Sequence, residues 1–183
     1  MATVEPVQPI ERVFTSRMES PIGALRLAAT ERGLAFLALP RAGGRGLGGW
    51  LARFAPDARR EEAFAPLRDA IRQILEYLDG KRTGFELGLD LRGTAFQRAV
   101  WRQLEAIPYG ETRAYADVAH AVGSPAAVRA VGSANGANPV PIVVPCHRVI
   151  ASGGKLGGYG GGLELKRRLL AMEQSLRHQG SLL

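Results

Sequence analysis

The spacing of apolar residues changes once along the chain, and this change limits the possible folds more than any other feature. Between residues 12 and 39, short apolar runs are separated by glycine-containing breaks at 21–23 and 31–33, which is typical of a strand meander. From residue 65 onward, apolar residues recur every three or four positions, as on one face of a helix. A mixed α/β chain is therefore expected. Its strands are predicted at 12–18, 24–30 and 34–39.

The helical part of the chain shows recognisable helix ends. Thr94 and Gln97 have the spacing of a capping box at the start of a helix. Gly123 separates two short helices, and the second is expected to begin with Ser124 as its N-cap and Pro125 in its first turn. A helix, a glycine turn and a second helix are the outline of a helix-turn-helix. The helices are predicted at 65–79, 95–107, 115–122 and 124–134, with a last one carrying Leu165, Leu169, Met172 and Leu176.

Two lobes follow from this pattern, with a boundary near residue 91. We expect an N-terminal lobe over 11–91 and a C-terminal lobe over 92–178, with loose tails at 1–10 and 179–183. The segment 42–49 has five glycines in eight residues, but it lacks the following Gly-Lys-Ser or Gly-Lys-Thr of a phosphate-binding loop. It is predicted to be a mobile connector.

The positive charge is concentrated in the second lobe. The chain carries 24 Lys and Arg against 17 Asp and Glu, and residues 92–183 carry 11 against 5, which is six of the seven net positive charges. Such a surface favours a polyanionic partner. Within this lobe, the predicted helix over 124–134 has mostly small side chains and one long cation, Arg129. Its backbone can therefore approach either the interior of the protein or a nucleic acid closely.

A single cysteine excludes an intrachain disulfide and a zinc site built from several cysteines. The sequence shows no leader-like start and no apolar run long enough for a membrane span. We therefore expect a cytoplasmic protein with no metal, no cofactor and no membrane contact. The 21 arginines among the 24 cations, with abundant alanine and glycine, favour a bacterial source.

The cysteine lies in a Pro-Cys-His-Arg motif at 145–148, directly after a segment with three prolines. Because proline restricts its own backbone and that of the preceding residue, a rigid extended segment is expected at 138–145. A thiol becomes a good nucleophile when an imidazole and guanidinium groups lie nearby. His147 and Arg148 supply these groups, although side chains of adjacent residues also occur without facing each other.

A glycine-rich stretch at 153–162 follows the motif and carries one aromatic side chain, Tyr159. Such a stretch can close over a flat ligand. The last predicted helix carries Glu173, whose carboxylate either orients a histidine or lies solvated on the helix surface. These residues indicate cysteine chemistry without fixing the reaction.

Taken together, the motifs resemble those of the methylated-DNA–protein-cysteine methyltransferases, the O6-alkylguanine-DNA alkyltransferase family. The resemblance runs through residues 93–175 and includes Asn-Pro-Val-Pro at 138–141, Pro-Cys-His-Arg-Val-Ile at 145–150 and Gly-Tyr-Gly-Gly-Gly at 158–162. Tyr115, Arg129 and Glu173 stand at matching distances. The resemblance implies an N-terminal RNase-H-like lobe of antiparallel strands with a helix, which matches the family only in layout. The C-terminal lobe is implied to be mainly helical and winged-helix-like, with the helix-turn-helix.

The resemblance implies DNA repair by direct reversal of damage. A methyl or other alkyl group moves irreversibly, in a single turnover, from O6 of guanine, and from O4 of thymine, to Cys146. By similarity, His147 takes the thiol proton through a water and is held by Glu173. Asn138 braces the turn, and Tyr115 donates to the departing base.

The resemblance also implies how the substrate is held. The carbonyls of Cys146 and Val149 accept from the guanine amino group, the N–H of Gly160 reaches O6, and Pro141 and Tyr159 complete the pocket. Arg129 enters the space left by the flipped nucleotide. The residues that approach the minor groove of double-stranded DNA are Ala127, Ala130, Gly132 and Tyr115. The implied partner is DNA containing O6-alkylguanine, bound by a monomer with or without cooperative assembly.

Two departures and two rival classes bear on this interpretation. Some members have a hydroxyl residue in place of Gly160, and some bind zinc in the N-terminal lobe, which here has neither a cysteine nor a histidine. A non-catalytic binder of alkyl lesions shares the C-terminal lobe but replaces the cysteine, so Cys146 argues against that class. A cysteine hydrolase also uses Cys and His, but it turns over repeatedly and needs an oxyanion hole that the sequence does not indicate.

Overall fold

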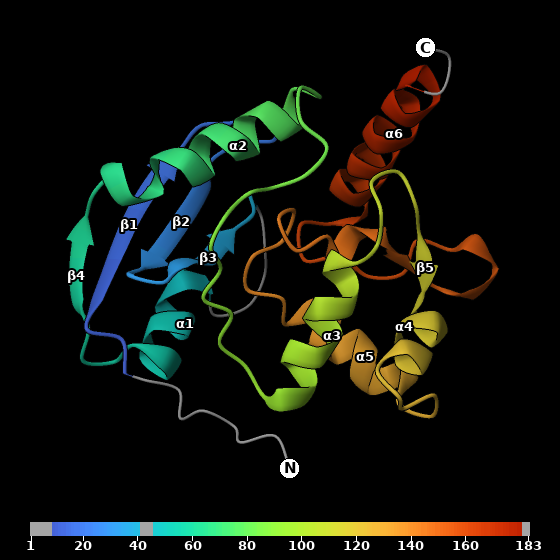
Figure 1. Ribbon diagram of the computed structural model, residues 1–183, viewed down its shortest axis with the longest axis horizontal. Helices are drawn as coiled ribbons and strands as arrows, with labels where there is room; N and C mark the ends of the chain where they lie inside the picture. The colour runs from blue at the N-terminus through green and yellow to red at the C-terminus, as the bar shows by residue number, and fades with distance from the viewer. Residues whose placement is uncertain (1–8, 41–45, 181–183) are drawn as a thin grey trace.

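The computed structural model describes residues 9–40 and 46–180, which form two lobes side by side (Figure 1). The N-terminal lobe holds a four-stranded sheet in the order β3-β2-β1-β4. Its strands are β1 (Arg12–Met18), β2 (Leu25–Thr30), β3 (Gly33–Ala38) and β4 (Arg59–Glu62). The three predicted antiparallel strands are confirmed. The fourth, β4, runs parallel to β1, and its sequence Arg-Arg-Glu-Glu gave no strand signal because it lacks apolar alternation.

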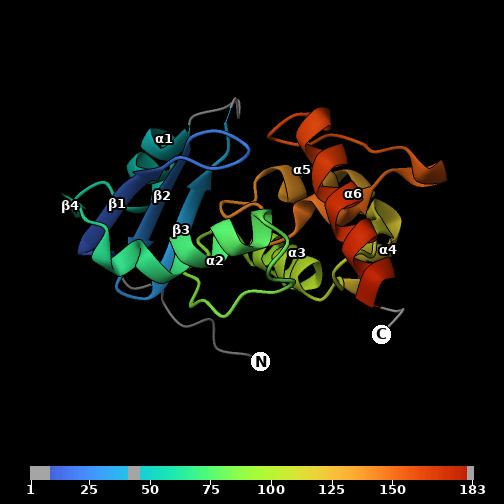
Figure 2. The same ribbon diagram turned by 90° about the horizontal axis from the view of Figure 1, so that it is seen from above.

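Helices cover both faces of this sheet (Figure 2). On one face, Leu25 and Leu27 of β2 pack in a core with Ile74 of α2 (Arg68–Leu78), which follows a short 3-10 turn, η1 (Ala65–Leu67). On the other face, Ala28 packs in a second core with Trp50 of α1 (Gly46–Phe54). Side chains of one strand thus alternate between two cores, as the two-residue period of a strand requires.

The prediction of a connector at 42–49 is wrong for residues 46–49, which form the first turn of α1. Residues 41–45 lie outside the described residues. Glycines are poor helix formers, but Trp50 and Leu51 are buried against the sheet, and this packing outweighs the local preference.

The C-terminal lobe contains α3 (Ala95–Glu105), α4 (Tyr115–Ala121), α5 (Val128–Gly136) and α6 (Leu163–Gly180), with a parallel pair of short strands, β5 (Arg113–Ala114) and β6 (Val149–Ile150). The capping box at Thr94 is confirmed, with the N–H of Gln97 donating to its Oγ1 at 3.2 Å. Among residues 9–40 and 46–180, no helix is long and apolar enough to cross a membrane.

The predicted start of the second helix of the helix-turn-helix is wrong. The N–H of Ala127 donates to the carbonyl of Ser124 at 2.8 Å, which closes a separate turn, and α5 begins only at Val128. Of the predicted tails, residues 1–8 and 181–183 lie outside the described residues. Ile10 is buried in the core around Trp50, and α6 includes residues 179 and 180.

The segment before the cysteine is a tight turn, so the prediction of an extended segment is wrong. The N–H of Val144 donates to the carbonyl of Val140 at 2.9 Å, and Ile142 has φ +76°. For a β-branched residue this conformation is strained by about 1–3 kcal/mol. Full burial of Ile142 holds it in place, and so does a hydrogen bond of 2.8 Å from the N–H of Leu37 in β3 to the carbonyl of Pro139.

Candidate active site

Cys146 lies at the wall of a cavity between the two lobes. It begins the 3-10 turn η2 (Cys146–Arg148), and its side chain is 4% exposed. The cavity has a volume of about 920 Å³ and is bounded by β3 and α1 on the N-terminal side. Seven residues singled out in the sequence line it: Tyr115, Gly132, Asn138, Pro141, Cys146, Tyr159 and Gly160.

Asn138 braces the turn that precedes Cys146. Its Nδ2 donates to the carbonyl of Val144 at 2.8 Å, and its Oδ1 accepts from the N–H of Val140 at 3.0 Å. Burial raises the pKa of the Cys146 thiol to about 11, although the hydrogen bond from Asn138 and the charge of Lys166 act to lower it. The thiol is therefore un-ionised at neutral pH, and attack by its sulfur requires a base.

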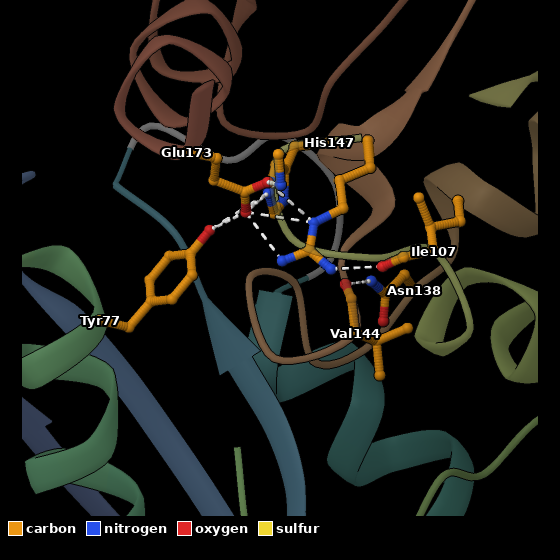
Figure 3. A network of polar contacts seen from close by, with 8 residues as sticks. Tyr77, Ile107, Asn138, Val144, His147 and Glu173 are labelled. Carbon is orange, nitrogen blue, oxygen red and sulfur yellow. Dashed lines mark hydrogen bonds and ion pairs between the residues drawn. The ribbon is translucent and has the colours of Figure 1, made fainter. Parts of the chain in front are cut away.

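A group that can accept the thiol proton lies in the neighbouring residue. His147 is fully buried, and its Nε2 lies 2.9 Å from Oε1 of Glu173, which projects from α6 and is also fully buried (Figure 3). Burial lowers the pKa of His147 despite the nearby carboxylate, so the imidazole is neutral at neutral pH and can accept a proton. Its Nδ1 is buried without a hydrogen-bond partner among the described residues.

Glu173 is held by several donors besides His147. Nε and Nη2 of Arg148 donate to its two oxygens at 2.9 Å each, and the N–H of Gly110 donates to Oε2 at 2.9 Å. Burial raises the pKa of Glu173, but the hydrogen bonds from His147 and Arg148 outweigh it and bring the pKa to about 2. The carboxylate is thus ionised and orients the histidine, and the alternative of a solvated carboxylate is wrong.

Three side chains of the site were not singled out in the sequence. Lys166 is fully buried, and its Nζ donates to the carbonyls of Val149 at 2.6 Å, Gly158 at 3.2 Å and Leu156. Asn135 donates to the carbonyl of Cys146 at 3.4 Å, and Tyr77 of α2 donates to Glu173.

A sequence signal existed for Lys166. It falls on the buried stripe of α6 with Leu169, Leu170 and Glu173, at the spacing i, i+3, i+4, i+7. A charged residue on such a stripe indicates a buried polar site. Tyr77 falls on the buried stripe of α2, where a tyrosine is indistinguishable from core.

The helix α5 has one buried side and one exposed side. Val131 and Ala134 are buried, whereas Arg129 and Ala130 are exposed and Ala127 is half-buried. One side of the helix therefore packs inside the lobe, and the other side, with Arg129, is exposed, so the structure leaves room for both alternatives that the sequence left open.

Comparison with known proteins assigns both lobes to one family. Models described as 6-O-methylguanine DNA methyltransferase match residues 13–91, as the ribonuclease-like domain, and residues 95–175, as the DNA binding domain. The methylated-DNA–protein-cysteine methyltransferase of Mycolicibacterium paratuberculosis is 48% identical over 158 residues, covering 86% of this chain and 90% of that protein. This chain belongs to the methylated-DNA–protein-cysteine methyltransferase family.

Other members of the family extend the match. The inducible methylated-DNA–protein-cysteine methyltransferase of Bacillus subtilis is 45% identical over 148 residues, covering 81% of this chain and 83% of that protein. The crystal structure of Mycobacterium tuberculosis OGT in complex with DNA superposes with a TM-score of 0.77 at 43% identity, covering 89% of this chain and 94% of that one. The predicted family, fold class and activity are thereby confirmed: the protein is a DNA-binding methyltransferase that repairs DNA by alkyl transfer to a cysteine.

Proposed function

We propose that Cys146 accepts the alkyl group in this methyltransferase and that the group comes from O6 of guanine in double-stranded DNA. The observation that supports this most is the position of the only cysteine. Its thiol lies on the wall of a cavity large enough for a flipped base, and Asn138 lines the same cavity. The next residue is a neutral histidine with an unused ring nitrogen.

The net reaction exchanges the alkyl group on O6 of guanine for the proton on the thiol. The thiol proton passes through a water to Nδ1 of His147, and the positive charge that results faces Glu173. The sulfur of Cys146 then forms its bond to the alkyl carbon as the bond from that carbon to O6 breaks. Tyr115 donates its proton to the departing guanine and regains one from solvent, to which His147 releases the proton that it took from the thiol. Burial raises the pKa of Tyr115, so it holds this proton at neutral pH.

The base is held mainly by backbone groups. The carbonyls of Cys146 and Val149 accept from the guanine amino group, and the N–H of Gly160 donates to O6. The carbonyl of Val149 already accepts from Lys166 at 2.6 Å, and its second lone pair remains for the base. Pro141 and Tyr159 line the same cavity and contact the base and the alkyl group.

DNA lies along α5, with its minor groove against the small side chains of Ala127, Ala130 and Gly132. Arg129 occupies the space that the flipped nucleotide leaves. The lobe over 92–178 carries this surface, the protein binds as a monomer, and the lobe over 11–91 closes the cavity from the other side. Because minor-groove contacts carry little sequence information and phosphate contacts dominate, binding is sequence-tolerant and weakens strongly with salt.

Mass spectrometry tests the proposal directly. After incubation with a duplex containing O6-methylguanine, the peptide with Cys146 is expected to gain about 14 Da, the mass of one CH₂, once per protein molecule. The Cys146→Ser variant is the matched control and gains nothing. An unmodified Cys146 peptide in the wild type, or repeated turnover without modification, contradicts the proposal, and repeated turnover would favour a hydrolase.

Replacing Arg129 separates base flipping from chemistry. Arg129→Ala is expected to slow repair of duplex DNA by about tenfold or more, because flipping costs a few kcal/mol that the inserted arginine offsets. Its reaction with the free modified base stays unchanged, since the thiol is untouched. Arg102→Ala, which removes an exposed arginine of α3, controls for lost charge. Equal losses of Arg129→Ala on both substrates would show that the arginine does not act on flipping.

A further inference from the structure

A hydroxyl group from the N-terminal lobe reaches the buried histidine of the C-terminal lobe. Tyr77 lies on α2 and is fully buried. Figure 3 shows its side chain extending from this helix toward Glu173 of α6. Its Oη donates to Oε1 of Glu173 and lies 3.3 Å from Nε2 of His147. The mechanism proposed above does not use this contact.

The directions of these hydrogen bonds follow from counting protons. Glu173 is ionised and can only accept, so the single proton of the Tyr77 hydroxyl points to its carboxylate. The Tyr77 oxygen then presents only lone pairs to Nε2 of His147. Both groups that face Nε2 are acceptors, so Nε2 carries the ring proton and Nδ1 is the bare nitrogen.

Glu173 by itself fixes the proton on Nε2 of His147 less firmly than Glu173 and Tyr77 do together, because its Oε1 is shared among several donors. That oxygen accepts from Tyr77, from His147 and from Nη2 of Arg148 at 2.9 Å. The guanidinium of Arg148 neutralises much of the carboxylate charge and thereby weakens its pull on the imidazole. A second acceptor at Nε2 matters most when the thiol proton arrives and the ring becomes positive in a fully buried position.

We propose that Tyr77 is a positioning residue for alkyl transfer, whose hydroxyl holds Glu173 and His147 so that Nδ1 is the nitrogen available to the thiol proton. This inference rests on the function proposed for Cys146 and His147. It also assigns the N-terminal lobe a direct part in the chemistry, because the hydroxyl comes from α2 and lies 96 residues from Glu173 in the sequence.

The Tyr77→Phe variant tests the hydroxyl while keeping the ring. The ring packs 5.2 Å from Phe85 and edge-on to Tyr109 at 6.0 Å, contacts that phenylalanine preserves. The matched control is Tyr109→Phe, because the Tyr109 hydroxyl is buried nearby without a partner among the described residues. Tyr77→Phe is expected to slow single-turnover methyl transfer about tenfold at unchanged DNA affinity, whereas Tyr109→Phe stays within about twofold of the wild type.

The tautomer of His147 is a second measurement. It would not change if Tyr77 served only to pack against its neighbours. In ¹⁵N NMR spectra of the wild type, His147 is expected to carry its proton on Nε2, and Tyr77→Phe is expected to add a population protonated on Nδ1. His147 is one of three histidines, so its signals are assigned by single substitutions.

Each outcome bears on Tyr77 separately from the reaction itself. A wild-type His147 protonated on Nδ1 overturns the proposal even if Tyr77→Phe does not fold. A folded Tyr77→Phe with a wild-type rate, or an equal loss in Tyr109→Phe, also overturns it. The mass gain on Cys146 of the wild type is measured in the same samples, so a failure of the proposed function is seen independently.

Discussion

Two buried arginine–carboxylate pairs, one between the lobes and one in the active site, differ in which other groups hydrogen-bond to the carboxylate. Arg92 donates to Asp90 at 2.6 Å, and Thr30 of β2 donates to the same carboxylate at 2.8 Å. Arg148 donates to Glu173 at 2.9 Å, but there the carboxylate also holds His147. The first pair ties the segment after residue 89 to the sheet, whereas the second also holds a histidine beside the cysteine. The comparison separates a carboxylate that bonds only to groups of fixed charge state from one that also bonds to a titratable ring.

The largest effect is expected from breaking the active-site pair. Glu173→Gln leaves Arg148 buried without its counter-charge, so the free energy of unfolding falls by about 3–5 kcal/mol. His147 also loses the carboxylate that stabilises its protonated form, and methyl transfer slows by about 100-fold. Chemical denaturation and single-turnover kinetics measure the two effects. A stability loss without a kinetic loss would place this pair in the same class as Arg92 and Asp90.

The matching change in the other pair is expected to affect stability alone. Asp90→Asn removes the charge facing Arg92 and weakens the bond to Thr30, which lowers the free energy of unfolding by about 3 kcal/mol. The folded variant is expected to transfer methyl groups at close to the wild-type rate, because the side chain of Asp90 bonds to Arg92 and Thr30 and not to His147 or Glu173. A slowed transfer at full folding would break the distinction between the two pairs.

A smaller effect is expected from acid. The pKa of Glu173 is about 2 in the folded protein, below its ordinary value of 4.5, so the ionised carboxylate stabilises the fold above pH 4.5. This contribution is lost as the pH falls from 4.5 toward 2. The difference in unfolding free energy between the wild type and Glu173→Gln is therefore expected to shrink over this window. A difference that stays constant between pH 5 and pH 3 would show that the carboxylate is not stabilised by the fold.

Elements governed by neighbouring residues could be predicted. The alternation of β1 to β3 and the capping box at Thr94 depend on contacts within a few residues, and so does the placement of Cys146 beside His147. The helix α1 could not be predicted, because only the sheet beneath Trp50 compensates for its glycines. For the same reason the prolines around Ile142 indicated stiffness but not the left-handed turn that tertiary packing imposes.

The sequence by itself determined the family, the strands β1 to β3, the helices α2 to α4 and the only cysteine, because each depends on residue identity and short spacing. Only the tertiary structure showed that Tyr77 and Lys166 also belong to the site around Cys146 and His147. Tyr77 and Glu173 are 96 residues apart, and Lys166 reaches the carbonyl of Val149 from 17 residues away. Such contacts exist because burial forces polar groups to find partners wherever the packed chain places them.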